Sequence, residues 1–154
     1  DVSFVKDEVK KRERLQYFKL KTGDIVLAMS GNTTGKIGVI PNLEKELFLN
    51  QRVGKFFIDN EKYKTFVYFF LMSGNYEERI LAMGYGSAQP NINPTQIENI
   101  DTIYPDDETL KNFVNIDSPI FTKILYNLNQ IQTLTRTRDT LLPKLMSGEL
   151  RVKF

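Results

Sequence analysis

The stretch SPIFTKILYNLNQIQTLTRTRDTLLPKLMSGEL, residues 118–150, decides how the rest of the chain is interpreted. Its apolar residues recur at steps of three and four, which places them in one stripe along a helix. The stripe consists of Phe121, Ile124, Leu125, Leu128, Ile131, Leu134, Leu141 and Leu142. Ser118 and Pro119 predict the start of this helix, and Pro143 predicts its end. From 118 to 142 it would be about 37 Å long at 1.5 Å per residue.

A stripe of this length needs a surface to cover it. One possibility is that it packs back on residues 1–105 as ordinary core. However, it is longer than the face that a small β-rich domain offers. Polar residues at Asn127, Gln130 and Gln132 also suit a contact between two helices better than a deep core. We therefore expect a helix from a second copy or from another chain to cover the stripe.

Composition excludes several function classes. The chain has 154 residues, 41% of them hydrophobic, which suffices for one ordinary domain and an appendage. It contains no Cys and no His, so thiol nucleophiles, imidazole bases, disulfides and the usual zinc ligands are excluded. The absence of Cys is typical of a cytoplasmic protein. The strongest apolar run, FVYFFLM at 66–72, is far shorter than the ~20 residues of a membrane span and resembles no signal peptide.

The charge distribution separates the chain into regions. A net charge of only +2 argues against a general polyanion binder. Residues 101–117 hold five acids and one lysine, whereas residues 118–154 hold six basic residues and two acids. Asp106, Asp107 and Glu108 could bind a metal, but adjacent acids after a proline are more typical of a solvated helix start. No metal site is therefore expected.

The pattern along residues 1–105 predicts a β-rich domain with a few helices. Strands are expected at 24–29, 36–40, 47–49, 54–58 and 100–104, and helices at 61–72 and 76–83. Residues 84–94 are expected to form a loop, and residues 105–119 a joint with one helical turn. The predicted fold class is α+β, with a domain at 1–105 followed by a helical region at 106–154.

Two polar segments are candidate binding sites. SGNTTGK at 30–36 looks like a phosphate loop, but it has three residues between its glycines and Ile37 after its lysine. It also joins two strands, so no helix N-terminus faces an anion. Such a hairpin tip can contact a nucleic-acid backbone or base edges, or it can be a plain tight turn.

The second segment, GYGSAQPNINP at 84–94, carries Gln89 and Asn91 on a loop stiffened by prolines. Side-chain amides are the groups that read adenine edges with two hydrogen bonds. The alternative is a crossing loop whose amides satisfy its own backbone. Asn93, Pro94 and Thr95 match an amino-methyltransferase motif only in part, and we interpret them as turn residues.

Three stretches together resemble the specificity (S) subunit of Type I restriction–modification systems. They are KLKTGDIVLAMSGNTTGKIGVI at 19–40, followed by LNQRVGKF at 49–56, then GSAQPNINPTQIENI at 86–100, and finally RDTLLPKLMSGEL at 138–150. The resemblance covers most of residues 14–154. It rests on the order and spacing of the stretches as well as on their residues.

The resemblance implies a DNA-recognition subunit that does no catalysis itself. Each recognition domain of that family reads one half of a bipartite double-stranded DNA target. A conserved helix after each domain pairs with the other in an antiparallel coiled coil. These helices dock methyltransferase (M) subunits, and restriction (R) subunits join the complex. S-adenosylmethionine, ATP and Mg²⁺ would belong to those partners, with no cofactor in this chain.

On this resemblance we expect the DNA side to include residues of both polar segments and of the stretch at 49–56. The expected set is Ser30, Asn32, Thr33, Thr34, Lys36, Arg52, Lys55, Tyr85, Ser87, Gln89 and Asn91. The chain departs from the family pattern because it has one recognition-domain portion and one helix, and because it begins inside that domain. A fragment or a split gene product would explain this. An assembly remnant that reads no DNA, or the recognition end of a fused restriction–methyltransferase, are the alternatives.

Overall fold

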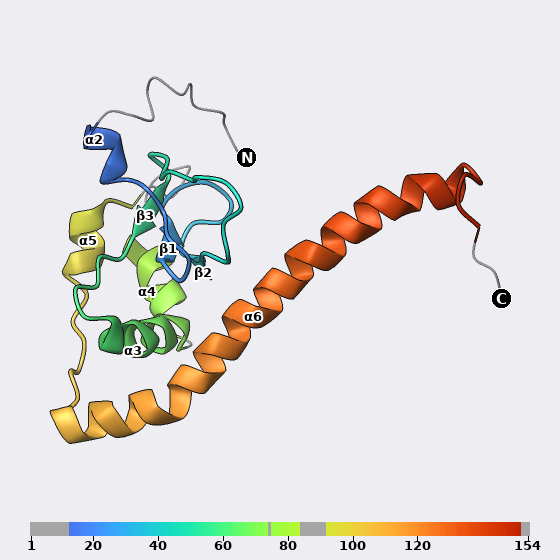
Figure 1. Cartoon of the computed structure of the whole chain (residues 1–154). Helices are drawn as coiled ribbons and strands as arrows, with labels where there is room; N and C mark the ends of the chain where they lie inside the picture. Colours follow the sequence, from blue (N-terminus) through green and yellow to red (C-terminus); the bar gives the residue numbers. More distant parts are fainter. Residues whose placement is uncertain (1–12, 74, 84–91, 152–154) are drawn as a thin grey trace.

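A computed structural model describes residues 13–73, 75–83 and 92–151 (Figure 1). The body contains α2 (Glu13–Gln16), β1 (Ile25–Ala28), β2 (Ile37–Val39), β3 (Val53–Lys55), α3 (Glu61–Met72), α4 (Tyr76–Met83) and α5 (Pro94–Glu98). The long helix α6 (Asp107–Met146) follows it. A small sheet with helices packed beside it and a helical appendage confirm the α+β class.

The sheet is antiparallel, in the order β2-β1-β3. Ile25 and Leu27 of the central strand are buried, and they alternate with half-buried neighbours as one covered face requires. Ile25 pairs with Val39 in β2, and Val26 pairs with Lys55 in β3. The predicted hairpin around the Ser30–Gly35 loop is therefore confirmed.

Two of the predicted strands are wrong. Residues 47–49 contribute one isolated bridge, between Phe48 and Lys19. Within the described residues, 100–104 pair with no strand, and Ile103 and Tyr104 are 91% and 60% exposed. Apolar composition suggested strands at both places, but a strand also needs a neighbouring edge with which to pair. The remaining strand, β3, is shorter and earlier than the predicted 54–58.

Helices α3 and α4 confirm the predictions for 61–72 and 76–83. The Asn60 side chain accepts a hydrogen bond from the Lys62 N–H at 3.1 Å, which caps α3. Tyr68 of α3 and Ile80 of α4 are buried with Ile25 and Leu27 of β1 in a single core. Burial raises the pKa of the Tyr68 hydroxyl, which is consistent with its place in that core.

The long helix begins earlier and ends later than the sequence predicted. Asp106 is its N-cap and accepts a hydrogen bond from the Thr109 N–H at 2.8 Å. Pro119 and Pro143 both lie inside the helix, so the predicted start at Ser118 and end at Leu142 are wrong. The acidic run is a helix start, as predicted, and its charges suit the positive end of the helix dipole.

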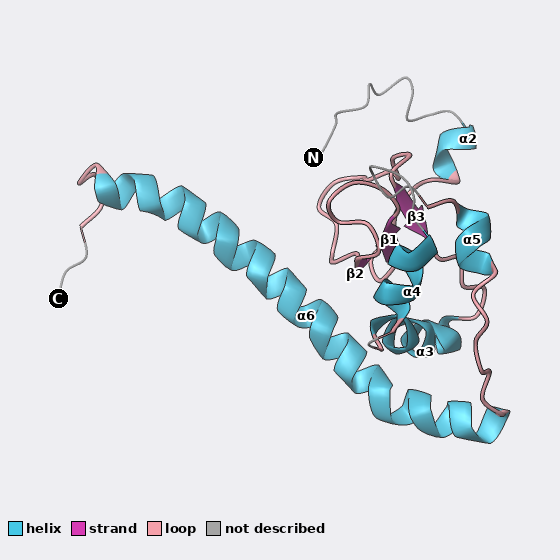
Figure 2. Cartoon of the chain, turned by 180° about the vertical axis from the view of Figure 1, so that it is seen from behind, coloured by secondary structure: helices cyan, strands magenta, loops and turns pink. Residues whose placement is uncertain are grey.

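Helix α6 has two differently placed parts. Its first turns lie along α3, with Leu110 buried, and the helix then bends and leaves the body (Figures 1 and 2). Just after Pro119, the ring of Phe121 meets that of Tyr68 at 5.0 Å between centroids. At 1.5 Å per residue the 40-residue helix is about 60 Å long, so much of it extends beyond the domain.

Candidate nucleic-acid interface

One end of the sheet collects most of the polar residues that the sequence singled out. Because β1 is antiparallel to both neighbours, its C-terminal end lies beside the N-terminal ends of β2 and β3. The Gly35 N–H donates to the Ala28 carbonyl at 2.8 Å, and the Met29 N–H donates to the Arg52 carbonyl at 2.9 Å. The Ile92 N–H donates to the Met29 carbonyl at 3.0 Å. Three separate segments therefore meet here.

We call this region the polar edge and define it by the exposed residues that it presents. These are Asn32, Thr33, Lys36 and Arg52. The edge offers two cationic groups, one amide and one hydroxyl, which are the groups that bind phosphates and base edges in DNA. Ser30 lies beside them and is half-buried. The sequence predicted all five, and the structure brings them together.

Thr34 has a different place from its neighbours in the loop. It is buried, and its hydroxyl donates to the Gly31 carbonyl at 2.6 Å. The Thr34 N–H donates to the same carbonyl at 3.1 Å. The buried Thr34 side chain therefore stabilises the turn at the hairpin tip through its hydrogen bond to the backbone.

The tip rests on α4. Gly35 has φ +86°, and a Cβ added there would lie 3.3 Å from the Cγ of Glu77 and 3.6 Å from that of Leu81. Glycine therefore supplies both the left-handed backbone and the room for close contact. On the other strand, the Asn50 side chain accepts the Arg52 N–H at 2.8 Å and holds the turn that carries Arg52. The exposed cations Lys36 and Arg52 therefore both lie on turns whose backbones are held by hydrogen bonds.

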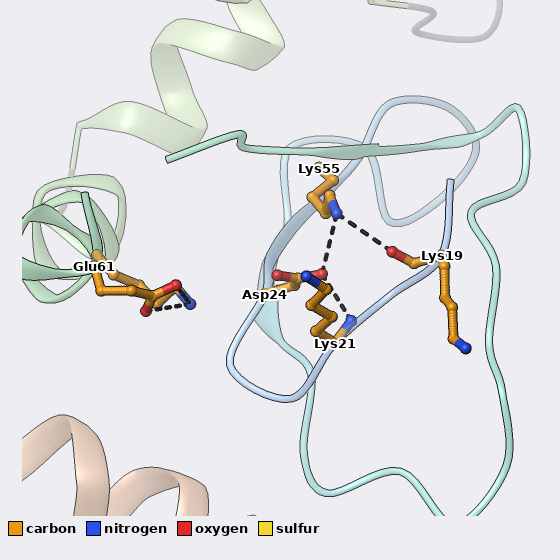
Figure 3. Close-up of polar contacts among 6 residues, drawn as sticks. Lys19, Lys21, Asp24, Lys55 and Glu61 are labelled. Atoms are coloured by element: carbon orange, nitrogen blue, oxygen red, sulfur yellow. Dashed lines mark hydrogen bonds and ion pairs between the residues drawn. The ribbon is translucent and has the colours of Figure 1, made fainter. Parts of the chain in front are cut away.

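The side chain of Lys55 points toward Asp24 and the Lys19 carbonyl (Figure 3). Its Nζ is 3.2 Å from the Asp24 carboxylate and 3.4 Å from the Lys19 carbonyl, and it lies 4.7 Å from the centre of the Phe57 ring. The side chains of Lys55 and Asp24 are only 9% and 13% exposed. Arg52 is three residues away, about 10 Å along an extended strand. The ammonium of Lys55 thus ties β3 to the start of β1.

The second polar segment lies largely outside the described residues, and with it Tyr85, Ser87, Gln89 and Asn91. Its two ends are described. Ile92 is buried against β1, and the Gln96 side chain donates to the Met83 carbonyl at 3.3 Å. Residues 84–91 therefore connect two described positions, the end of α4 and Ile92 at the polar edge.

The last residues of this segment correct one prediction. Asn93 and Gln96 form a reciprocal capping box, with bonds of 3.0 and 2.9 Å. Pro94 is the first residue of α5, whereas the sequence pattern predicted a loop there. A proline is favoured at the first position of a helix because no partner is needed for its missing N–H.

The sequence did not reveal a groove beside β3. It has a volume of about 820 Å³ and lies between β3, α5 and the residues after α2. Tyr17 and Phe57 at its side are exposed and stacked, with 4.9 Å between their ring centres. These rings are 40 positions apart, so no local pattern could pair them. In the described part of the chain, no group of three or more acidic side chains is placed to hold a metal ion.

The apolar stripe of α6 is divided between two surroundings. Phe121 is buried against the body, and Ile124 and Leu125 are half-buried against the same core. Leu128 is also half-buried. The members further along the helix are exposed, namely Ile131, Leu134, Leu141 and Leu142. The chain itself covers the first half of the stripe, so the prediction that a partner helix covers all of it is wrong for that half. For the exposed half, a partner helix stays a prediction.

Comparison with known proteins gives consistent matches. A family model described as the Type I restriction modification DNA specificity domain matches residues 5–136. The specificity subunit of the Type I restriction enzyme MjaVIII from Methanocaldococcus jannaschii is 30% identical over 138 residues, which cover 87% of this chain and 32% of the relative. The HindI specificity subunit from Haemophilus influenzae is 31% identical over 116 residues, covering 74% and 25%. The chain therefore spans about a third or less of these relatives. Among the helices that the structure describes, none is both long and apolar enough to cross a membrane.

Proposed function

Because the chain belongs to the Type I restriction modification DNA specificity domain family, we propose that it recognises DNA sequence within a Type I restriction–modification enzyme. In this proposal residues 1–105 read one half of a bipartite target, and residues 106–154 assemble the complex. The methyltransferase and restriction subunits supply the chemistry, together with S-adenosylmethionine, ATP and Mg²⁺. The chain itself is not an enzyme.

The observation that carries the proposal is the convergence of the polar edge. The Ser30–Lys36 loop and Arg52 are more than ten residues apart in sequence, yet β1 brings them to one end of the sheet. Ile92, the residue after Asn91 in sequence, is hydrogen-bonded to Met29 at the same place. Phosphate contacts position a protein on DNA, whereas base contacts specify the sequence. A site that reads DNA needs both kinds of group close together.

We assign roles by chemistry. Lys36 and Arg52 bind phosphates, while the side chains of Asn32, Thr33, Gln89 and Asn91 bind base edges. Tyr85 and Ser87 of the second polar segment complete the contact surface. Thr34 and Ser30 shape the hairpin tip. Lys55 supports the sheet from its other end, because its charge is already paired with Asp24.

Salt titration of DNA binding by the assembled enzyme tests these roles. Lys36→Ala removes one phosphate contact, so the slope of log Kobs against log[salt] should become shallower by about 0.9. Lys111→Ala is the matched control, an exposed lysine at the start of α6 that should leave the slope unchanged. Asn32→Ala should instead relax the methylated sequence at one position. An unchanged slope in Lys36→Ala together with an unchanged motif in Asn32→Ala would remove the polar edge from the DNA interface.

The exposed half of the stripe supports the assembly part of the proposal. At about 100° per residue, Leu134 and Leu141 point roughly 140° and 160° around the helix axis from Phe121. Since Phe121 faces the body, these leucines face away from it. We propose that a helix from a second copy, or from the other half of the specificity subunit, covers them in an antiparallel coiled coil and that methyltransferase subunits dock on the pair.

A second candidate function is assembly without DNA reading. The exposed stripe of α6 favours it, since that surface needs a partner whether or not DNA is bound. Light scattering and a gel shift on the full chain separate the two functions. A dimer that shifts DNA at low salt supports recognition. A dimer that shifts no DNA, alone or with methyltransferase subunits, supports assembly only.

A further inference from the structure

Pro119 changes the course of α6. It has no N–H to donate to the Asn115 carbonyl, and its ring crowds that carbonyl, so a helix bends at an internal proline. Figures 1 and 2 show α6 running along α3 and then turning away from the body. Phe121, two residues after the proline, is buried against Tyr68 and fixes the helix at the bend. The bend is therefore packed against the body through the contact between Phe121 and Tyr68.

A second support lies further along the helix, at residues 41–47, the segment between β2 and β3. The Asn42 N–H donates to the Asn129 side chain at 2.7 Å. The Glu44 carboxylate pairs with Arg136, also at 2.7 Å. A groove of about 720 Å³ lies between this segment and α6, so these polar links span a gap. Asn129 and Arg136 are seven residues apart, two turns on the same side of the helix.

We infer that Pro119, Asn129 and Arg136 are positioning residues: they set the direction in which α6 leaves the body, and so place the partner helix relative to the polar edge. This inference rests on the proposed function, because it states how one half-site is held at a set distance from the other. Pro119 bends the helix, and the two polar links hold the bent part against the 41–47 segment.

The geometry amplifies small changes of direction. From Pro119 to Met146 the helix runs about 40 Å at 1.5 Å per residue. A change of about 10° at the proline would therefore move the far end by roughly 7 Å, which matches about two base steps of 3.4 Å. Two recognition domains that bind the two halves of one DNA target cannot be displaced by this amount relative to each other. The contacts of Phe121 at the bend and of the 41–47 segment at the middle of the helix would limit this displacement.

Distance measurement between two spin labels tests the direction itself. The chain has no cysteine, so Lys62→Cys on α3 and Arg138→Cys on α6 label two positions cleanly. Pro119→Ala should fold, since alanine is the best helix former, and should shift the mean distance by several ångströms. Asn129→Ala combined with Arg136→Ala should broaden the distance distribution. Thr122→Ala, at an exposed position of the same helix, is the control and should match the parent.

A second measurement separates positioning from mere stabilisation. In the assembled enzyme, methylation is compared on duplexes whose two half-sites are separated by gaps that differ by one base pair. Pro119→Ala should change the preferred gap and leave each half-site sequence unchanged, and Arg136→Lys should restore the parent behaviour that Arg136→Ala loses. Unshifted label distances, or a uniform loss of methylation at every gap, would overturn the inference. The label distances need no DNA, so they still decide it if the proposed function fails.

Discussion

The clearest quantitative test compares two apolar residues of the same helix, Phe121 and Leu134. Phe121 is 7% exposed and packs edge to face on Tyr68, whereas Leu134 is 66% exposed. Truncation of a buried phenylalanine to alanine costs about 3–5 kcal/mol in well-packed cores. We expect Phe121→Ala to lower the free energy of unfolding by about 3 kcal/mol, because an interface between a helix and a body can partly close around the cavity.

Leu134→Ala is the matched control. Alanine and leucine both favour helices, and the leucine side chain lies in solvent, so the change in unfolding free energy should stay within about 0.5 kcal/mol. Urea denaturation of the dilute full chain, followed by circular dichroism, measures both variants. A domain of this size has a total stability of roughly 5–15 kcal/mol, so the two results would be easily distinguished.

In self-association the larger effect should come from Leu134→Ala, whereas in unfolding it should come from Phe121→Ala. If Leu134 lies in the contact between two helices, its truncation should weaken that contact at least ~10-fold, an effect of about 1.4 kcal/mol. Sedimentation over a concentration series measures this. The division of the stripe is refuted if Leu134→Ala destabilises the dilute chain as much as Phe121→Ala does, since the outward half would then pack on the body. It is also refuted if association is insensitive to Leu134.

Two further predictions concern charged groups. Asp24→Ala leaves the nearly buried ammonium of Lys55 without its carboxylate, and should lower stability by about 3 kcal/mol in a urea titration. Asp139→Ala, which removes a surface pair with Arg138, should cost less than about 1 kcal/mol. Hydrogen bonds from the Thr109 backbone and then its hydroxyl lower the pKa of Asp106. The ionised Asp106 carboxylate therefore stabilises the folded protein at any pH above the pKa of the unfolded carboxyl. This stabilisation is lost as the pH falls through the lowered pKa of the folded state. Asp106→Ala should thus be less stable than the parent at pH 7, and the difference should vanish in acid; a difference that persists at low pH would contradict this.

Sequence reasoning succeeded where local chemistry decides the structure. The glycines and small polar residues of the 30–35 loop predicted a hairpin, and Gly31 and Gly35 both have the positive φ that such a turn uses. Asn60 predicted the start of α3, and its side chain caps that helix. In these cases the signal lies within a few residues, so no knowledge of the rest of the fold is required.

The start of α6 could not be predicted in the same way. Asp106 and Ser118 are both good N-caps, and Ser118 is followed by a proline, which made it the stronger signal. The choice between them is made by Leu110, which is buried, and by Phe113, whose ring meets Phe66 of α3 at 5.8 Å. Those contacts favour helix before Pro119 and outweigh its cost. Tertiary packing, rather than a capping signal, set this boundary.

The sequence suggested candidate DNA-binding residues but could not show how they are arranged, and their role in DNA binding stays a prediction. Lys36, Arg52 and Lys55 look equivalent in sequence, as basic residues near strand ends. Antiparallel pairing places Lys55 toward the start of β1, where the carboxylate of Asp24 lies, and places the other two beside its end. The distinction depends on the strand direction and on one acid about thirty positions away, and neither can be derived from the local pattern.

The divided stripe explains how one helix can contact both its own domain and a partner. Apolar residues that repeat every seven positions advance by about 20° less than two full turns per repeat, so their stripe drifts around a straight helix. Near Phe121 the stripe faces the body, and by Leu141 it has turned to the other side. This drift amounts to about 60° over the three repeats from Phe121 to Leu142. Leu134 and Leu141 occupy a different heptad position and lie roughly 140° and 160° from Phe121. The drift and the second heptad position together turn these exposed leucines away from the domain within one continuous helix. A change that shifted the spacing, such as one inserted residue after Leu128, would turn the outward leucines by about 100° and separate the two contacts.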